Sequence, residues 1–147
     1  MFDSFGPGMG FAGGFATGQL MQDLLCGAGS YGDWARAAIE VTTSVQASYR
    51  HHLEDAEEPN TRELARDLDA LGREAQRLAI IAEQRNYGQE EVDLMRRLDR
   101  LCLRFTNGAP NTEQSPEELL RDDLPALVSE IFDQFDRETS PADPNRG

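Results

Sequence analysis

The sequence contains no lysine and no long apolar run, and it has only two cysteines. All 14 basic residues are arginines, against 27 acidic residues, so the net charge is -13 at pH 7. A surface of that sign repels the phosphates of nucleic acids and anionic lipid headgroups, which disfavours both as partners. No stretch approaches the roughly 18 consecutive apolar residues that a membrane-spanning helix needs. We therefore expect a protein that neither binds nucleic acid nor spans a membrane.

The scarcity of cysteine and the lack of a signal segment bear on the compartment. Cys26 and Cys102 are too few for a disulfide framework, and both fall at apolar positions of predicted helices. We expect them to be buried free thiols in a reducing compartment. The N-terminus lacks a basic stretch followed by a compact apolar one, so no secretory signal is expected. Together these features predict a cytoplasmic protein.

Recognisable catalytic and cofactor motifs are also missing. His51 and His52, which acidic residues follow, form the only cluster with metal-ligand chemistry, but no Glu-x-x-His pair accompanies them. We interpret this cluster as a polar helix end, and the alternative is a weak transition-metal site across a subunit contact. Ser44 and Ser48 lie near the histidines without a loop that would orient a base or build an oxyanion hole. The sequence therefore predicts no enzyme, no cofactor and no metal.

What the sequence does contain is a pair of apolar stripes at helical spacing within residues 60–107. The first stripe covers residues 64–82 and the second covers residues 91–105, in steps of three and four. Such steps place each stripe on one face of a helix. Asn86 and Gly88 between the stripes favour a left-handed helix stop, so the second helix folds back on the first. This pattern predicts an antiparallel helical hairpin, and the alternative is pairing of the first stripe between chains.

Two further helices flank the hairpin in the sequence. The first is expected from near Asp33 to about Glu57, with Ser30 or Asp33 as its cap and an apolar stripe of mean step close to 3.6. The other is expected to begin at Ser115, because serine, proline and two glutamates in succession form a capping-box signal. Pro125 interrupts that last helix and predicts a kink or a break.

These elements predict an all-α fold, a small bundle of three or four helices around the antiparallel helical hairpin. The helical domain is expected over residues 33–138. A Gly/Phe-rich arm of residues 1–32, with nine of the 13 glycines, precedes it, and a disordered tail of residues 139–147 follows it. Charge is distributed unevenly. Residues 59–108 are neutral overall, with arginines alternating with acids such as Asp67 along the polar side, and both flanks are acidic.

Apolar side chains outside the hairpin are the candidate contact surfaces. Phenylalanines of the arm either dock on a neighbouring subunit or partner, or cover the domain's own core. Insertion of the arm into a membrane surface is disfavoured because residues 1–32 contain no basic residue. Phenylalanines of the last helix either complete the core or lie in a partner's groove. The sequence thus predicts a non-enzymatic assembly or adaptor protein, in the first instance a homo-oligomer. The alternative is an acidic regulator that binds the basic surface of a nucleic-acid-binding protein. The predicted contact residues are Phe2, Phe5, Phe11, Phe15, Phe132 and Phe135.

Overall fold

The computed structural model describes residues 22–107 and 115–139, and long helices account for most of them. In chain order the elements are α2 (Tyr31–Tyr49), the short π-helix η2 (Arg50–Glu54), α3 (Thr61–Gln84), α4 (Gln89–Asn107) and α5 (Pro116–Thr139). The described residues contain no strand, which confirms the predicted all-α class. Among them, no helix has the length and apolar character needed to cross a membrane.

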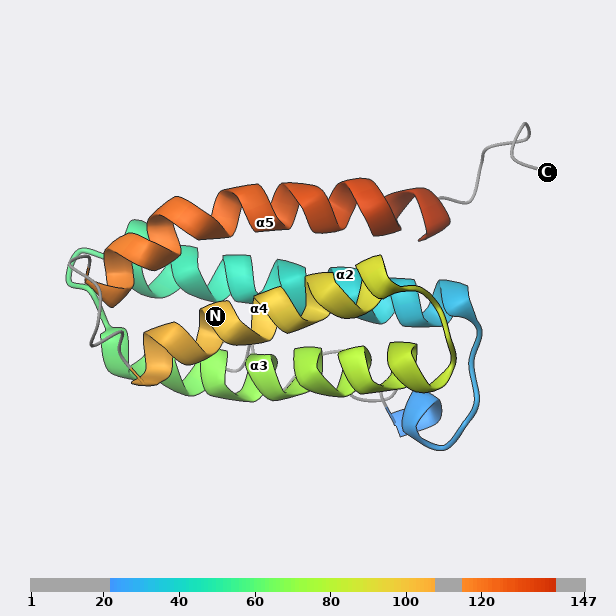
Figure 1. Ribbon diagram of the computed structural model, residues 1–147. Coiled ribbons are helices and arrows are strands. Elements are labelled where there is room, and N and C mark those ends of the chain that lie inside the picture. Colours follow the sequence, from blue (N-terminus) through green and yellow to red (C-terminus); the bar gives the residue numbers. More distant parts are fainter. Residues whose placement is uncertain (1–21, 108–114, 140–147) are drawn as a thin grey trace.

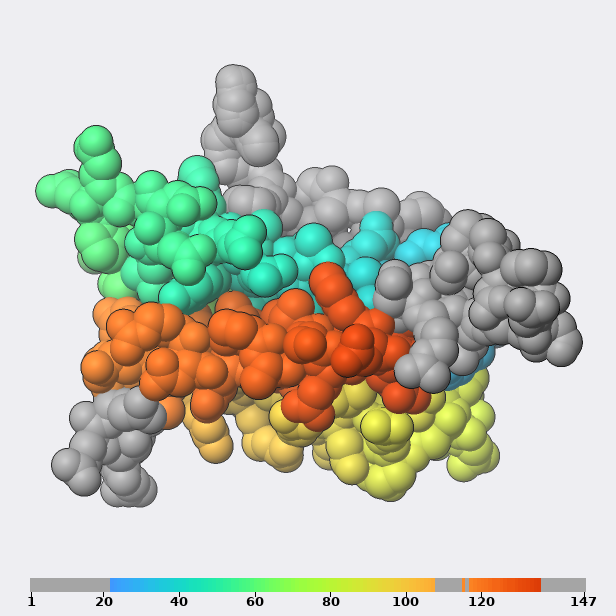
Figure 2. Space-filling view, turned by 90° about the horizontal axis from the view of Figure 1, so that it is seen from above, coloured from blue at the N-terminus to red at the C-terminus, as the bar shows by residue number. Residues whose placement is uncertain are grey.

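The four long helices run alternately up and down, and each packs against two neighbours (Figure 1). α3 packs most extensively on α4, which confirms the predicted antiparallel hairpin. α2 lies against both α3 and α5, and α4 also contacts α5. Figure 2 shows α5 running between α2 and α4 across one face of the molecule. The hairpin is therefore closed by α2 and α5 into a four-helix bundle.

The apolar stripes of the helices meet in one core inside the chain's own bundle. The stripes of residues 64–82 and 91–105 are both buried there. Trp34 is fully buried, and its indole N–H donates to the backbone oxygen of Leu78 at 2.9 Å. Its ring also contacts that of Phe135, with centroids 5.1 Å apart. The single tryptophan thus joins α2, α3 and α5.

Helix starts carry the caps that the local sequence indicates. Ser30 and Asp33 form a reciprocal capping box at α2, where each side chain accepts the other's backbone N–H. Ser115 and Glu118 form the same arrangement at α5. At α3, the side chain of Asn60 accepts a backbone N–H of the first turn. These bonds satisfy donors that a helix start leaves without partners.

The turn between α3 and α4 uses two residues of left-handed conformation, as the sequence predicts. Asn86 has φ 56° and Gly88 has φ 139°. Residues other than glycine rarely adopt the backbone conformation of Gly88. A Cβ at this position would also lie 2.5 Å from the carboxylate of Glu91. Glu91 is itself buried, and it accepts the hydroxyl of Tyr31 at 2.7 Å. The turn is thereby linked to the start of α2.

Two expectations about helix continuity are wrong, the break at Pro125 and the unbroken α-helix to about Glu57, whereas a kink at Pro125 stays a prediction. α5 runs through Pro125 without ending, although proline removes the hydrogen bond to the carbonyl of residue 121. Both Arg121 and Pro125 are exposed, so water can solvate that carbonyl, while buried leucines on the opposite side hold the helix on the core. The first helix also ends differently, since α2 changes to the π-helix at Arg50 rather than continuing as an α-helix to Glu57.

Candidate functional site

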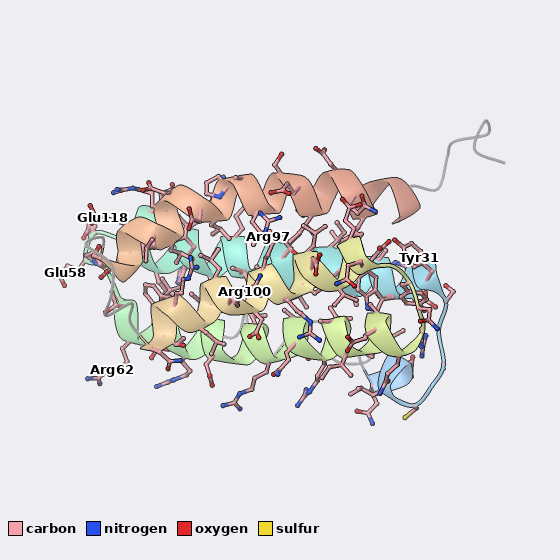
Figure 3. The ribbon with its side chains drawn as sticks, in the orientation of Figure 1. Tyr31, Glu58, Arg62, Arg97, Arg100 and Glu118 are labelled. Carbon is pink, nitrogen blue, oxygen red and sulfur yellow. The ribbon has the colours of Figure 1, made fainter. Side chains whose placement is uncertain are left out.

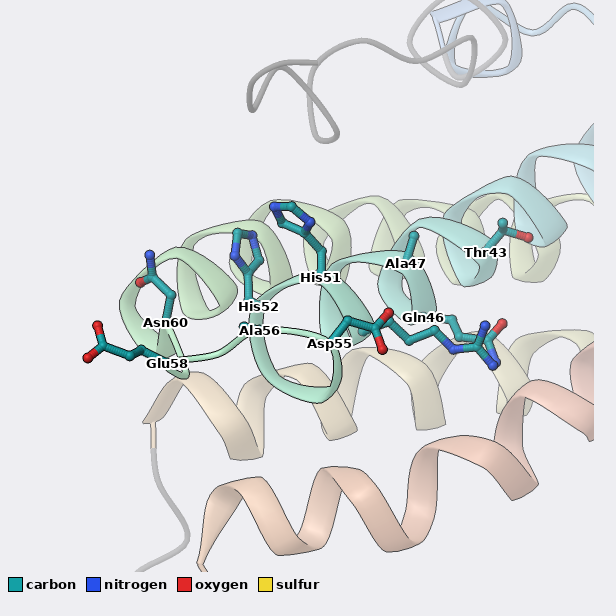
Figure 4. Close-up of a pocket in the computed structure, with 10 residues that line it drawn as sticks. Thr43, Gln46, Ala47, His51, His52, Asp55, Ala56, Glu58 and Asn60 are labelled. Atoms are coloured by element: carbon teal, nitrogen blue, oxygen red, sulfur yellow. The ribbon is translucent and has the colours of Figure 1, made fainter. Parts of the chain in front are cut away.

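A surface pocket of about 690 Å³ opens at the π-helical end of α2 (Figure 4). Short π-helical segments occur frequently at functional sites. Most of the lining side chains are polar or charged, and they include both histidines of the cluster that the sequence singles out. The lining residues that matter below are Arg50, His51, His52, Asp55, Glu58 and Asn60.

The π-helical turn shapes this pocket by redirecting one backbone carbonyl. The N–H of Asp55 donates to the oxygen of Arg50 at 2.7 Å, five residues back rather than four. The carbonyl of His52, which would accept from residue 56 in an α-helix, instead accepts the N–H of Asn60 at 2.9 Å. The carbonyl of His52 therefore links η2 to Asn60, the residue that caps α3.

A buried carboxylate on α3 holds the side chain of the same histidine. Nε2 of His52 lies 3.1 Å from Oδ2 of Asp67, and that oxygen also accepts the hydroxyl of Ser48 at 2.7 Å. Asp67 is buried, so its predicted place on the solvent-facing side of the helix is wrong. Ser48 is fully buried and directs its proton to the carboxylate. The three groups form a polar contact between helices, and they lack the exposed nucleophile that a catalytic triad needs.

The other histidine lines the pocket without assembling a metal site. The rings of His51 and His52 meet edge to face, with centroids 4.8 Å apart. Across the two described ranges, no group of three or more histidine, cysteine, aspartate or glutamate side chains is arranged to hold a metal ion. Asp55 and Glu58 add carboxylates to a lining that also contains Arg50. The pocket offers hydrogen-bond donors and acceptors of both charges to a small polar group.

The structure describes two of the six predicted contact residues. Phe135 is fully buried against Trp34, and Phe132 is partly buried against the same core. Both phenylalanines thus pack α5 on the chain's own bundle, and their contact with a partner stays a prediction. The residues that lie outside the described ranges are Phe2, Phe5, Phe11 and Phe15.

The described end of the N-terminal arm is bound to the turn between α3 and α4. Residues 22–25 form one helical turn, and Leu24 is buried against the core. Arg85 donates to three backbone oxygens within residues 24–29 at 3.0, 3.1 and 3.2 Å, and to the hydroxyl of Tyr87 at 3.1 Å. The guanidinium thereby joins the end of α3 to the helical turn at Leu24 and to the backbone that follows it, at Ala28 and Gly29. The sequence places Arg85 among the polar-side arginines, and its spacing does not distinguish it from them.

Residues 22–30, called the anchored segment below, show that the expected burial of both cysteines is wrong for Cys26. Leu25 is 53% exposed, and Cys26 is exposed rather than buried. Cys102 is buried in α4 as predicted, and both cysteines are free thiols. In this single helical turn the side chain of Leu24 faces the core, so the side chains of Leu25 and Cys26 face outward.

Acidic side chains from two distant segments meet at the end of the bundle that holds η2. Glu54 of η2 and Glu117 of α5 border the same pocket of about 530 Å³, beside Tyr49. Burial raises the pKa of the Tyr49 hydroxyl, and the charges of Glu54 and Asp122 raise it further, whereas Arg121, which lines the same pocket, acts against that rise. The two acid-rich flanks of the sequence thus converge in space. At this acidic end, Figure 3 also shows Glu58 and Glu118.

No family model, curated protein sequence or solved structure gives a significant match to the chain. Function is therefore inferred from local features of the described residues. The features that bear on it most directly are the anchored segment at Arg85, the acidic end around Tyr49 and the polar pocket at η2.

Proposed function

We propose that the chain is a cytoplasmic, non-enzymatic assembly or adaptor protein, which associates with a second copy of itself through its N-terminal arm. The anchoring of residues 22–30 by Arg85 and Leu24 supports this proposal. Because the anchored segment is already held on the bundle, it loses less entropy when it binds a partner. Leu25 lies in the anchored segment and supplies an exposed apolar side chain for the contact.

The outer faces of the long helices contribute less to the proposed association. The stripes of α3 and α4 are buried within the bundle, which disfavours their pairing between chains. Large exposed apolar side chains on the described parts of the helices are Ile80 of α3 and Leu103 of α4, at 42% and 43% exposure. Single exposed apolar residues are ordinary on protein surfaces. We therefore assign the helical faces a supplementary role beside the arm.

Light scattering after size exclusion, on the full-length chain at low and high salt, tests this function. We expect an oligomer that persists at high salt, because apolar contacts are not screened. Replacing the four arm phenylalanines together with serine should yield a monomer. Leu103→Ser is the comparison, since it removes an exposed apolar side chain from α4 and should weaken the oligomer far less than the arm substitutions do. A wild-type monomer at both salt concentrations would contradict self-assembly.

A second candidate function rests on the acidic end. Convergence of carboxylates around Tyr49 supports an acidic regulator that occupies the basic surface of a nucleic-acid-binding protein. Such an interaction forms fast and weakens steeply with salt.

Binding to a basic peptide such as polyarginine, measured by fluorescence anisotropy, tests the second candidate. The affinity should fall when the carboxylates of the acidic end are converted to amides: Glu54→Gln, Glu58→Gln, Glu117→Gln and Glu118→Gln. The control converts as many exposed carboxylates elsewhere on the bundle: Asp69→Asn, Glu83→Gln, Glu90→Gln and Asp93→Asn. Equal losses in the two variants would show attraction by net charge alone, without a specific acidic surface.

A further inference from the structure

We propose that a groove between α4 and α5 binds the linked phosphates of a small molecule, a role beyond the assembly function proposed above. The groove has a volume of about 420 Å³, within the range of small-ligand pockets. Arg97, Arg100 and Arg104 line it, and Asp123 is the acidic residue among the described lining residues. Figure 3 shows Arg97 and Arg100 on α4. A protein with net charge -13 thus holds a groove whose lining is positively charged.

The first of these arginines is held in a defined orientation by α5. Nη1 and Nη2 of Arg97 donate to the two carboxylate oxygens of Glu130 at 2.9 and 2.7 Å. This hydrogen bonding raises the pKa of Arg97 and lowers the pKa of Glu130, so both stay charged. A guanidinium has five N–H donors, and the bidentate pair leaves others for a ligand. Arg97 is thereby positioned in advance of binding.

The next two arginines are engaged more weakly. Nη1 of Arg104 lies 3.8 Å from Oδ2 of Asp123, and both side chains are about half exposed. Arg100 makes no side-chain hydrogen bond or ion pair with the part of the chain that the structure describes. Burial raises the pKa of the adjacent Asp99, and the charge of Arg100 acts against that rise. Because Arg100 and Arg104 are four residues apart on one helix face, both can reach the same anion.

The spacing and chemistry of the groove favour linked phosphates over a single carboxylate. The three arginines span about 10 Å along α4. One carboxylate occupies one guanidinium bidentately, whereas a diphosphate presents enough oxygens for several. Leu101 and Leu127 add apolar surface to the groove, which suits an organic group attached to the phosphates. Long nucleic acids would still be repelled by the acidic remainder of the molecule.

Calorimetric titration of the full-length chain with inorganic pyrophosphate tests this site. We expect saturable binding to wild type, and an affinity about tenfold lower in Arg100→Gln, because a hydrogen bond between charged groups is worth about that much. The matched control is Arg62→Gln. Arg62 is an exposed arginine at the start of α3, outside the groove, which also lacks an ion pair among the described residues (Figure 3). Its replacement should leave the affinity unchanged.

Three results would overturn the phosphate site: no saturable binding to wild type, equal loss of affinity in both variants, or tighter binding of short polyglutamate than of pyrophosphate. The last would identify a site for acidic peptides instead. Titration with ADP separates the two sources of linked phosphate. Tighter binding of ADP than of pyrophosphate supports an organic diphosphate that also contacts the leucines, and equal affinity supports recognition of the phosphates alone.

Discussion

Asp67 joins α3 to the end of α2 through a single oxygen atom. Its Oδ2 accepts the hydroxyl of Ser48 and faces Nε2 of His52, and its side chain is only 12% exposed. Helical spacing cannot separate a charged residue at the margin of the buried face from one on the outside. Ser48 lies on α2 and His52 on η2, so no pattern within α3 reveals the burial of this carboxylate.

We expect Asp67→Ala to lower the free energy of unfolding by about 2 to 3 kcal/mol, because it leaves the buried Ser48 hydroxyl without its acceptor. Urea unfolding followed by circular dichroism measures the change. Asp69→Ala is the control. Asp69 forms an exposed ion pair with Arg73 at 2.9 Å, and its loss should change stability by less than about 0.5 kcal/mol. Equal losses would mean that Asp67 contributes no more than a surface carboxylate.

The two thiols should differ in reactivity as they differ in exposure. Burial, with a smaller effect of the Asp99 charge, raises the pKa of Cys102 to about 12, whereas Cys26 is exposed. Since the thiolate is the reactive form, a disulfide reagent at pH 8 should modify one thiol per folded chain quickly and the second only after unfolding. Folded Cys26→Ser protein should show no fast reaction. Two fast thiols in the native protein would contradict the burial of Cys102.

At the scale of elements, helix caps and stripes are readable from sequence because they depend on residues three or four positions apart. The capping boxes at Ser30 and Ser115 and the α3–α4 hairpin were therefore predictable. The π-helical turn and the anchored segment were not. His52 meets its carboxylate 15 positions away, and Arg85 meets a carbonyl 61 positions away. Contacts between residues so far apart in the sequence depend on the tertiary packing of the helices.

α5 tests how far packing overrides local preference, since it retains Pro125 in its interior. We expect Pro125→Ala to raise the free energy of unfolding by about 1 to 3 kcal/mol, because it restores one helical hydrogen bond and removes the ring. Ala126→Gly, at the next exposed position, should instead lower it by about 1 kcal/mol. Urea titrations measure both. Unchanged or lower stability in Pro125→Ala would show that the proline ring contributes to packing.

At the scale of the whole molecule, the bundle shares one core, with Trp34 in contact with α3 and α5. We therefore expect tryptophan fluorescence and helical circular dichroism to change with the same midpoint in urea, as in a two-state transition. An earlier fluorescence change would mean that α5 leaves the bundle before the rest unfolds. That result would revive the interpretation of α5 as an element that docks in a partner's groove.

The order of the long helices along the chain is also their order around the bundle, so the first and the last are neighbours (Figure 1). Trp34 near the start of α2 touches Phe135 near the end of α5. A circularly permuted chain is therefore compatible with the same packing, in which residues 115–139 come first and a flexible linker joins them to residues 22–107. Such a permutant should keep the tryptophan emission of the original. The four long helices thus form a closed ring of contacts, and the same contacts can form whichever of the connecting segments is cut to give the chain its two ends.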